Sequence, residues 1–120
     1  MNDSKRGLLA GAMLGDALAL GAHWIYDTDE IKKLFGDFDG FTDPIKNPYH
    51  KTKKIGDFTH YGDQLMMLVS SIQKEGSYNP TKYLTAWRES MKHYSGYMDH
   101  ASKITLETGQ GSDSFDGSAL

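Results

Sequence analysis

Five stretches of the chain repeat apolar residues at the three- and four-residue spacing of an α-helix, and no stretch alternates like a strand. The first stretch can be capped by Asp3 or Ser4 and runs to about Leu20. The second lies between Asp27, a good N-cap, and Gly36, a good C-cap. The pattern therefore predicts an all-α fold.

Three of the five predicted helices lie in the second half of the chain. The third begins at Thr59 or His60 and ends at Gly76. Asn79-Pro80 is a cap and first-turn pair for the fourth, and the fifth begins near Asp99. The spacing predicts buried positions at Leu65, Met66, Leu68, Val69, Ile72, Tyr83, Leu84, Trp87, Met91, Ala101, Ile104 and Leu106.

Two segments are irregular. Residues 36–57 hold two X-Pro pairs, three glycines and several lysines, and a loop of this length in a compact domain is usually functional or mobile. Its lysines could meet a diphosphate or could simply be solvated; they are Lys46, Lys51, Lys53 and Lys54. The stretch "GSDSFDGS" near the end could hold a cation through oxygens, although it lacks the EF-hand spacing.

Composition narrows the function classes. At 120 residues the chain is one domain or a piece of one, and a net charge of -3 argues against general nucleic-acid binding. No uncharged run is long enough to span a membrane. The chain has no cysteine, which excludes disulfides and thiolate metal sites and leaves the redox compartment open. Gly7, Gly11, Gly15 and Asp16 favour a packed first helix over a signal peptide, and we expect a cytoplasmic location.

The stretch "FTHYGDQLMMLVSSI" opens an otherwise apolar helix with polar residues. His60 and Asp63 lie three apart and share a helix face, next to Thr59 and Gln64. The free N–H groups of a first turn attract phosphate or carboxylate. The simpler interpretation is that Thr59 caps the helix and Asp63 favours its dipole. His60 and Asp63 supply at most two metal ligands, so no metal motif is complete.

The stretch "GDALALGAHWIYD" is the second candidate. Asp16 interrupts an apolar run, and a buried carboxylate needs partners, either a ligand or the backbone of another element. His23 could meet a ligand or hydrogen-bond a backbone carbonyl. Trp24 and Tyr26 could stack on a nucleobase or belong to the core.

Together these stretches resemble the ADP-ribosylglycohydrolase family, across essentially the whole chain. "GLLAGAMLGDALALGAHWIYD" is similar to the family's opening helix, "FTHYGDQLMMLVSSI" to its second motif, and "GYMDHASKITLE" and "GSDSFDGSAL" to its downstream stretches. The branch it resembles most contains the J1-crystallins. The resemblance implies an all-helical fold more than twice this length that cleaves an ADP-ribosyl bond with two magnesium ions. We therefore expect residues 1–120 to be one helical domain fragment, the N-terminal portion of a larger all-α domain.

The metal-binding positions depart from the family pattern. The second motif usually reads Thr-Asp-Asp-Thr, and the matching positions here hold His60, Tyr61, Gly62 and Asp63. A glutamate that normally binds metal aligns near His23, and the remaining acidic ligands come from a later region than this chain reaches. We expect the magnesium pair to be missing, with zinc or another transition metal better suited to the imidazoles.

The resemblance implies a hydrolase with a variant metal site that cleaves an ADP-ribosyl or related N- or O-glycosidic bond. The alternatives are a non-catalytic ADP-ribose-binding or crystallin-like structural relative, and a plain helical interaction fragment. Asp63 and His60 are the candidate catalytic residues and metal ligands, and Thr59, His23 and Asp16 the candidate substrate-binding residues. We expect all five to converge on one cleft between the first and third helices.

The expected partner is a small-molecule or ADP-ribosylated substrate, with no nucleic acid and no membrane. Five short helices would leave apolar faces uncovered, because a small domain buries a modest share of its surface. We therefore expect a homo-oligomer or a missing C-terminal portion to cover them.

Overall fold

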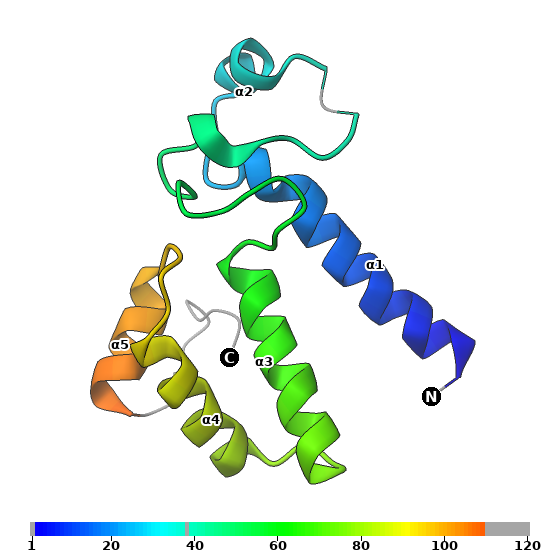
Figure 1. Cartoon of the computed structure of the whole chain (residues 1–120), viewed down its shortest axis with the longest axis vertical. Helices are drawn as coiled ribbons and strands as arrows, with labels where there is room; N and C mark the ends of the chain where they lie inside the picture. Colours follow the sequence, from blue (N-terminus) through cyan, green and yellow to red (C-terminus); the bar gives the residue numbers. More distant parts are fainter. Residues whose placement is uncertain (1, 38, 110–120) are drawn as a thin grey trace. The chain divides into compact units, whose positions relative to one another are not determined.

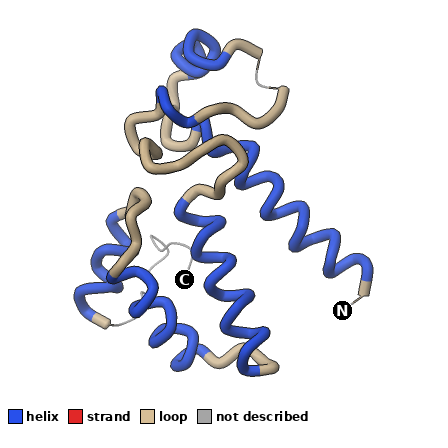
Figure 2. The backbone as a smooth tube through the Cα atoms, in the orientation of Figure 1, coloured by secondary structure: helices blue, strands red, loops and turns tan. Residues whose placement is uncertain are grey.

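Helices account for all the regular structure in residues 2–37 and 39–109, the part of the chain that the computed structural model describes (Figure 1). No strand occurs among these residues, so the predicted all-α fold is confirmed (Figure 2). The chain divides into two compact units, one up to Gly62 and one from Asp63 onward, and each is described by itself. The expectation of a single helical domain fragment stays a prediction.

The first unit begins with α1, Asp3–Ala19, followed by a single 3-10 turn, η1, Leu20–Ala22. The side chain of Asn2 caps α1 by accepting a hydrogen bond from the backbone N–H of Lys5 at 3.1 Å. The cap predicted at Asp3 or Ser4 was therefore placed one or two residues too late.

The second helix follows its sequence signals closely. α2 spans Thr28–Phe35, and the Asp27 carboxylate accepts hydrogen bonds from the N–H groups of Asp29 and Glu30. Gly36 ends it with φ of 72°, a backbone conformation that favours glycine.

The described residues between α2 and α3 are irregular except for η2, Pro44–Lys46, and are drawn mostly in tan in the upper part of Figure 2. It contacts η1, where Leu20 and Gly21 are buried. A Cβ on Gly21 would overlap the side chain of Thr42, so glycine allows the loop to lie against the η1 backbone.

The second unit comprises most of α3, His60–Glu75, with α4, Pro80–Lys92, and α5, His100–Thr108. Asn79 caps α4 and Asp99 caps α5, at the predicted places. The core is formed by Tyr83, Trp87 and Met91, with partly buried Leu68 and Leu106 among the residues packed against it.

A fully buried amide connects the three helices of this unit. Gln64 on α3 accepts a hydrogen bond from the indole N–H of Trp87 at 2.8 Å and donates one to the Ser102 hydroxyl at 3.3 Å. Both ends of the amide are thus used inside the core. Gln64, a candidate site residue in the sequence, has a structural role here.

Three of the predicted buried positions are exposed. Met66 and Ile72 on α3 are each 37% exposed, and Ile104 on α5 is 42% exposed. Met66 lines an open groove of about 760 Å³ along α3 and α4, together with Met67 and Thr85 among others. Helical spacing identifies the apolar face of a helix, but which segments pack against that face depends on residues far away in the sequence.

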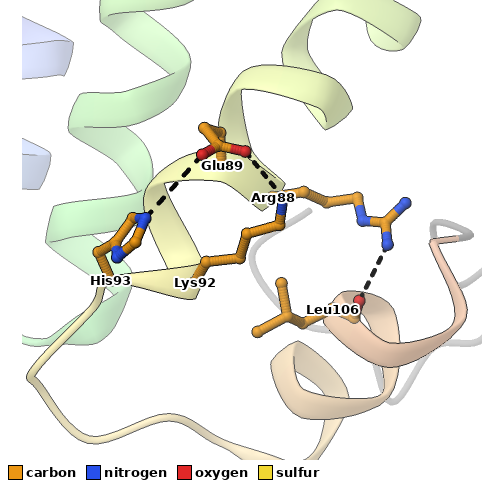
Figure 3. A network of polar contacts seen from close by, with 5 residues as sticks. All are labelled: Arg88, Glu89, Lys92, His93 and Leu106. Carbon is orange, nitrogen blue, oxygen red and sulfur yellow. Dashed lines mark hydrogen bonds and ion pairs between the residues drawn. The ribbon is translucent and has the colours of Figure 1, made fainter.

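Polar contacts join the end of α4 to α5 and to its own preceding turn (Figure 3). The Arg88 guanidinium donates a hydrogen bond to the carbonyl of Leu106 at 3.2 Å. The Glu89 carboxylate accepts a hydrogen bond from Lys92 Nζ at 2.8 Å. Its other oxygen lies 3.9 Å from Nε2 of His93, whose side chain is well exposed. Exposed pairs of this kind contribute little stability. Within the described residues, no helix is both long and apolar enough to cross a membrane.

Candidate functional site

The carboxylate of Asp16 holds the start of α3. Its Oδ2 accepts a hydrogen bond from the backbone N–H of Thr59 at 2.8 Å, and its Oδ1 accepts one from the Thr59 hydroxyl at 2.6 Å. The Thr59 oxygen in turn accepts from the N–H of Tyr61 at 3.1 Å, as a helix-capping residue does. The buried Thr59 therefore fixes the first turn of α3 against α1 within the first unit.

This contact depends on a glycine. A Cβ at Gly62 would overlap the Asp16 carboxylate and would lie 2.7 Å from the Cβ of Phe58, closer than real Cβ contacts. The Asp16 carboxylate thus occupies the space that a side chain at position 62 would need. An acidic ligand at position 62 is incompatible with this arrangement.

Three imidazoles gather in the same unit. His23 follows η1, His50 lies in the long loop, and His60 is the first residue of α3. One nitrogen from each of the three rings can be chosen so that these three nitrogens all lie within 4.8 Å of one another. The rings are nearly parallel: His23 lies 5.2 Å from each of the other two by ring centroid, at angles of 15° to His50 and 7° to His60.

Asn47 brings two of these histidines together. Its fully buried amide donates hydrogen bonds to the carbonyl of Gly21 at 3.0 Å and to that of His23 at 2.9 Å. Its own oxygen accepts from the N–H of Tyr49 at 2.9 Å, which turns the chain toward His50. One side chain therefore fixes both the end of η1 and the loop.

The backbone is strained beside His23. Trp24 has a φ of 70°, which is rare for a bulky residue and costs of order 1–3 kcal/mol. Such strain persists only where the surrounding contacts fix the conformation, and it is commonly found at functional sites. The Trp24 ring lies 6.3 Å from that of His60, so the strained residue borders the imidazole cluster.

Burial keeps two rings of the cluster, His23 and His50, neutral. Desolvation, and then the charge of nearby His60, lowers the pKa of His23 to about 4, while Asp16 opposes the shift. Desolvation also lowers the pKa of His50 to about 4, with further contributions from His23, His60 and Lys53. Both rings are neutral at pH 7, and a neutral imidazole has a nitrogen lone pair available for a metal ion or a proton.

Asp63 belongs to the second unit, where the hydroxyl of Tyr94 donates a hydrogen bond to its Oδ2 at 2.6 Å. Within the first unit, the Asp16 carboxylate contacts Thr59, and the rings of His23 and His60 are stacked. Convergence of all five residues on one cleft, including Asp63, stays a prediction.

The other sequence candidates have separate outcomes. Tyr26 is 81% exposed, so this side chain is not part of the core of the described residues. Lys51 and Lys54 are exposed in the loop that carries His50. The stretch "GSDSFDGS" lies outside the described residues.

Sequence reasoning missed His50. It was grouped with the surrounding lysines of the irregular loop, although three of the chain's five histidines fall in its first half. The Asn47-Pro48 pair just before it was the available local signal, because such a pair in a loop indicates a defined turn.

A sequence profile described as ADP-ribosylglycohydrolase matches residues 2–117. The chain belongs to the ADP-ribosylglycohydrolase family. It is also 26% identical over 87 residues to crystallin J1A of Tripedalia cystophora, an alignment that covers 71% of this chain and 27% of that protein. No solved structure matches the chain.

Members of this family are typically metal-dependent. The magnesium pair implied by the resemblance needs oxygen ligands in near-octahedral geometry. At the four matching positions the chain offers an imidazole at His60, a phenol at Tyr61, no side chain at Gly62 and one carboxylate at Asp63. Because Asp16 fills the space beside Gly62, no simple shift restores the missing oxygen, and these residues do not fit a magnesium pair.

Proposed function

We propose that this chain contributes to an ADP-ribosylglycohydrolase-like hydrolase whose metal site is altered, and which cleaves an ADP-ribosyl or related N- or O-glycosidic bond. The observation that carries the proposal is the polar first turn of α3, which Asp16 and Thr59 hold in place beside neutral imidazoles in a family member.

Hydrolysis of such a bond needs two proton transfers. A water oxygen bonds to the anomeric carbon as the bond to the leaving nitrogen or oxygen breaks, while one proton leaves the water and another reaches the leaving group. Asp63 is the proposed acceptor of the proton from water, because its carboxylate is part-buried and oriented by the Tyr94 hydroxyl. His60 and His23 are assigned to proton transfer or to metal ligation.

Substrate binding would use the same turn. Thr59 and Asp16 fix the backbone at the start of α3, where the partial positive charge of a helix N-terminus favours phosphate groups. The exposed Lys51 and Lys54 on the preceding loop add positive charge suited to a diphosphate.

The test is release of free ADP-ribose from ADP-ribosylated substrates by the full-length protein, with and without added divalent metals. Asp63→Asn should lower the rate by about 100-fold or more, because general-base catalysis contributes roughly 10²–10⁴-fold. Asp39→Asn, at an exposed loop position, is the matched control and should leave the rate unchanged. An unchanged rate in Asp63→Asn would exclude the assigned role.

A second function is favoured by the match to crystallin J1A, which supports a non-catalytic structural or ADP-ribose-binding relative. In that case the full-length protein binds ADP-ribose without turning over any substrate. Calorimetry with ADP-ribose, run beside the release assay, distinguishes the two functions.

A further inference from the structure

The imidazole cluster has the composition of a transition-metal site. We infer that His23, His50 and His60 together bind one divalent transition-metal ion of the zinc type, each through one ring nitrogen. The inference does not depend on hydrolysis, because the same three ligands would hold the ion in a catalytic or in a structural relative.

The distances are close to those required. At the usual Zn–N distance of about 2.0–2.1 Å, the nitrogens of a tetrahedral site lie roughly 3.3 Å apart. The three nitrogens already lie within 4.8 Å of one another without an ion. Side-chain rotations that bring them closer by about 1.5 Å, and tilt the nearly parallel rings toward a common point, complete the site.

Burial also favours a ligand at this position. His50 and His60 are fully buried, and Nδ1 of His23 is buried without a hydrogen-bond partner in the described part of the chain. Buried polar atoms normally have a partner, so an unsatisfied imidazole nitrogen beside two other imidazoles needs an explanation. A metal ion supplies that partner.

The protein scaffold holds the three ligands from separate segments. Asn47 fixes the backbone of His23 and the loop leading to His50. Asp16, through Thr59, fixes the turn from which His60 projects. Hydrogen bonds around the ligands are typical of metal sites, because they orient the first-shell groups.

The ligand set selects the metal. Three imidazoles without a carboxylate suit zinc, copper, nickel or cobalt, whereas magnesium and calcium prefer oxygen. Three protein ligands on zinc leave a fourth position open for water or another small ligand. The site therefore differs in both ligands and metal preference from the acidic cage that the matching positions lack.

The experiment is calorimetric titration of the metal-stripped, tag-free full-length protein with Zn²⁺ and, separately, with Mg²⁺. We expect one Zn²⁺ per chain and no competition from excess Mg²⁺. His50→Gln should weaken Zn²⁺ binding by about 100-fold or more, since even loss of an outer-shell partner costs about 10- to 100-fold. His93→Gln is the matched control, because that imidazole is exposed at the end of α4 and should not contribute (Figure 3).

A measurement on the unmodified protein guards against misfolding of the variant. Long-range ¹H–¹⁵N spectra report each of the five imidazoles, and Zn²⁺ should shift His23, His50 and His60 while leaving His93 and His100 in place. Co²⁺ should give the visible absorption of a four-coordinate site. Absence of Zn²⁺ binding, equal affinity in folded His50→Gln, or shifts at His93 and His100 alone would overturn the inference.

These readouts measure binding and not turnover. A protein that binds Zn²⁺ through the three histidines but releases no ADP-ribose would contradict the proposed hydrolase and leave the metal site intact. Release of ADP-ribose by a protein that does not bind Zn²⁺ would contradict the metal site and leave the proposed hydrolase intact.

Discussion

Asn47→Ala should selectively loosen the part of the first unit that carries the imidazoles. The substitution removes three hydrogen bonds, to the carbonyls of Gly21 and His23 and from the N–H of Tyr49. Each hydrogen bond contributes about 1 kcal/mol net, so the free energy of unfolding should fall by about 3 kcal/mol. The Asn47 side chain is fully buried, so water does not readily replace its hydrogen bonds. The freed loop would also let His50 move away from the cluster.

The assay is hydrogen exchange followed by mass spectrometry on the metal-stripped full-length protein, read for the segments 20–24 and 47–57. Asn79→Ala is the control, because Asn79 makes one exposed capping bond, to Lys82 N at 3.0 Å, and its loss costs about 1 kcal/mol in α4 alone. In Asn47→Ala we expect faster exchange in both segments and unchanged exchange in α4. An Asn47→Ala effect below about 1 kcal/mol would refute the positioning role.

Three further predictions concern the same two units. With metal removed, the free energy of unfolding of the first unit should be constant above about pH 6.5 and should fall as the pH drops toward 4. Burial lowers the pKa of His50 to about 4, so the expected loss for that group is about 3 kcal/mol, measured by urea titration across this range. A free energy of unfolding that does not change over this range would contradict the burial of His50. Gly62→Ala should lower the melting temperature through overpacking worth roughly 1–3 kcal/mol, whereas Gly7→Ala, in open space on α1, should raise it slightly. Gln64→Leu should cost about 1–3 kcal/mol because the buried Trp87 N–H loses its acceptor, and a neutral result by denaturant unfolding would show that the amide bridge is dispensable.

The helices could be predicted because their signals are local. Asp27, Gly36, Asn79 and Asp99 each begin or end a helix through contacts within a few residues, and all four occupy the predicted positions. The start of α1 was less certain because three neighbouring polar residues can all cap, and Asn2 makes the bond. Neighbouring caps compete by small energies that sequence alone does not rank.

Burial was harder to predict than helix position. Met66 and Ile72 lie on the apolar side of α3 and are nevertheless each 37% exposed. The spacing of apolar residues fixes which side of a helix is apolar, but the identity of its cover depends on segments far away in sequence. Gln64 is the opposite case. It is polar and was therefore not predicted to be buried, but two hydrogen bonds inside the core make its burial favourable.

The residues around the imidazole cluster differ in how visible they are in the sequence. Asp16, His23, Thr59 and His60 attracted attention because each is a polar residue at a conspicuous place in an apolar context. His50 lies in an irregular loop with no periodicity, so only the long-range bonds of Asn47 reveal where it goes. Loop placement of this kind rests on contacts 24 and 26 residues apart in sequence, which a single sequence does not display.

The first turn of α3 agrees with the proposed altered metal site at two positions. An acidic side chain at position 62 would need space beside the backbone of α3. At Gly62 that space is filled by the Asp16 carboxylate, which is itself satisfied by two hydrogen bonds from Thr59. At His60 the imidazole joins two others, and one nitrogen from each of the three rings lies within 4.8 Å of the other two. The two changes are compatible with each other, since the carboxylate that excludes a side chain at Gly62 also fixes the turn from which His60 projects.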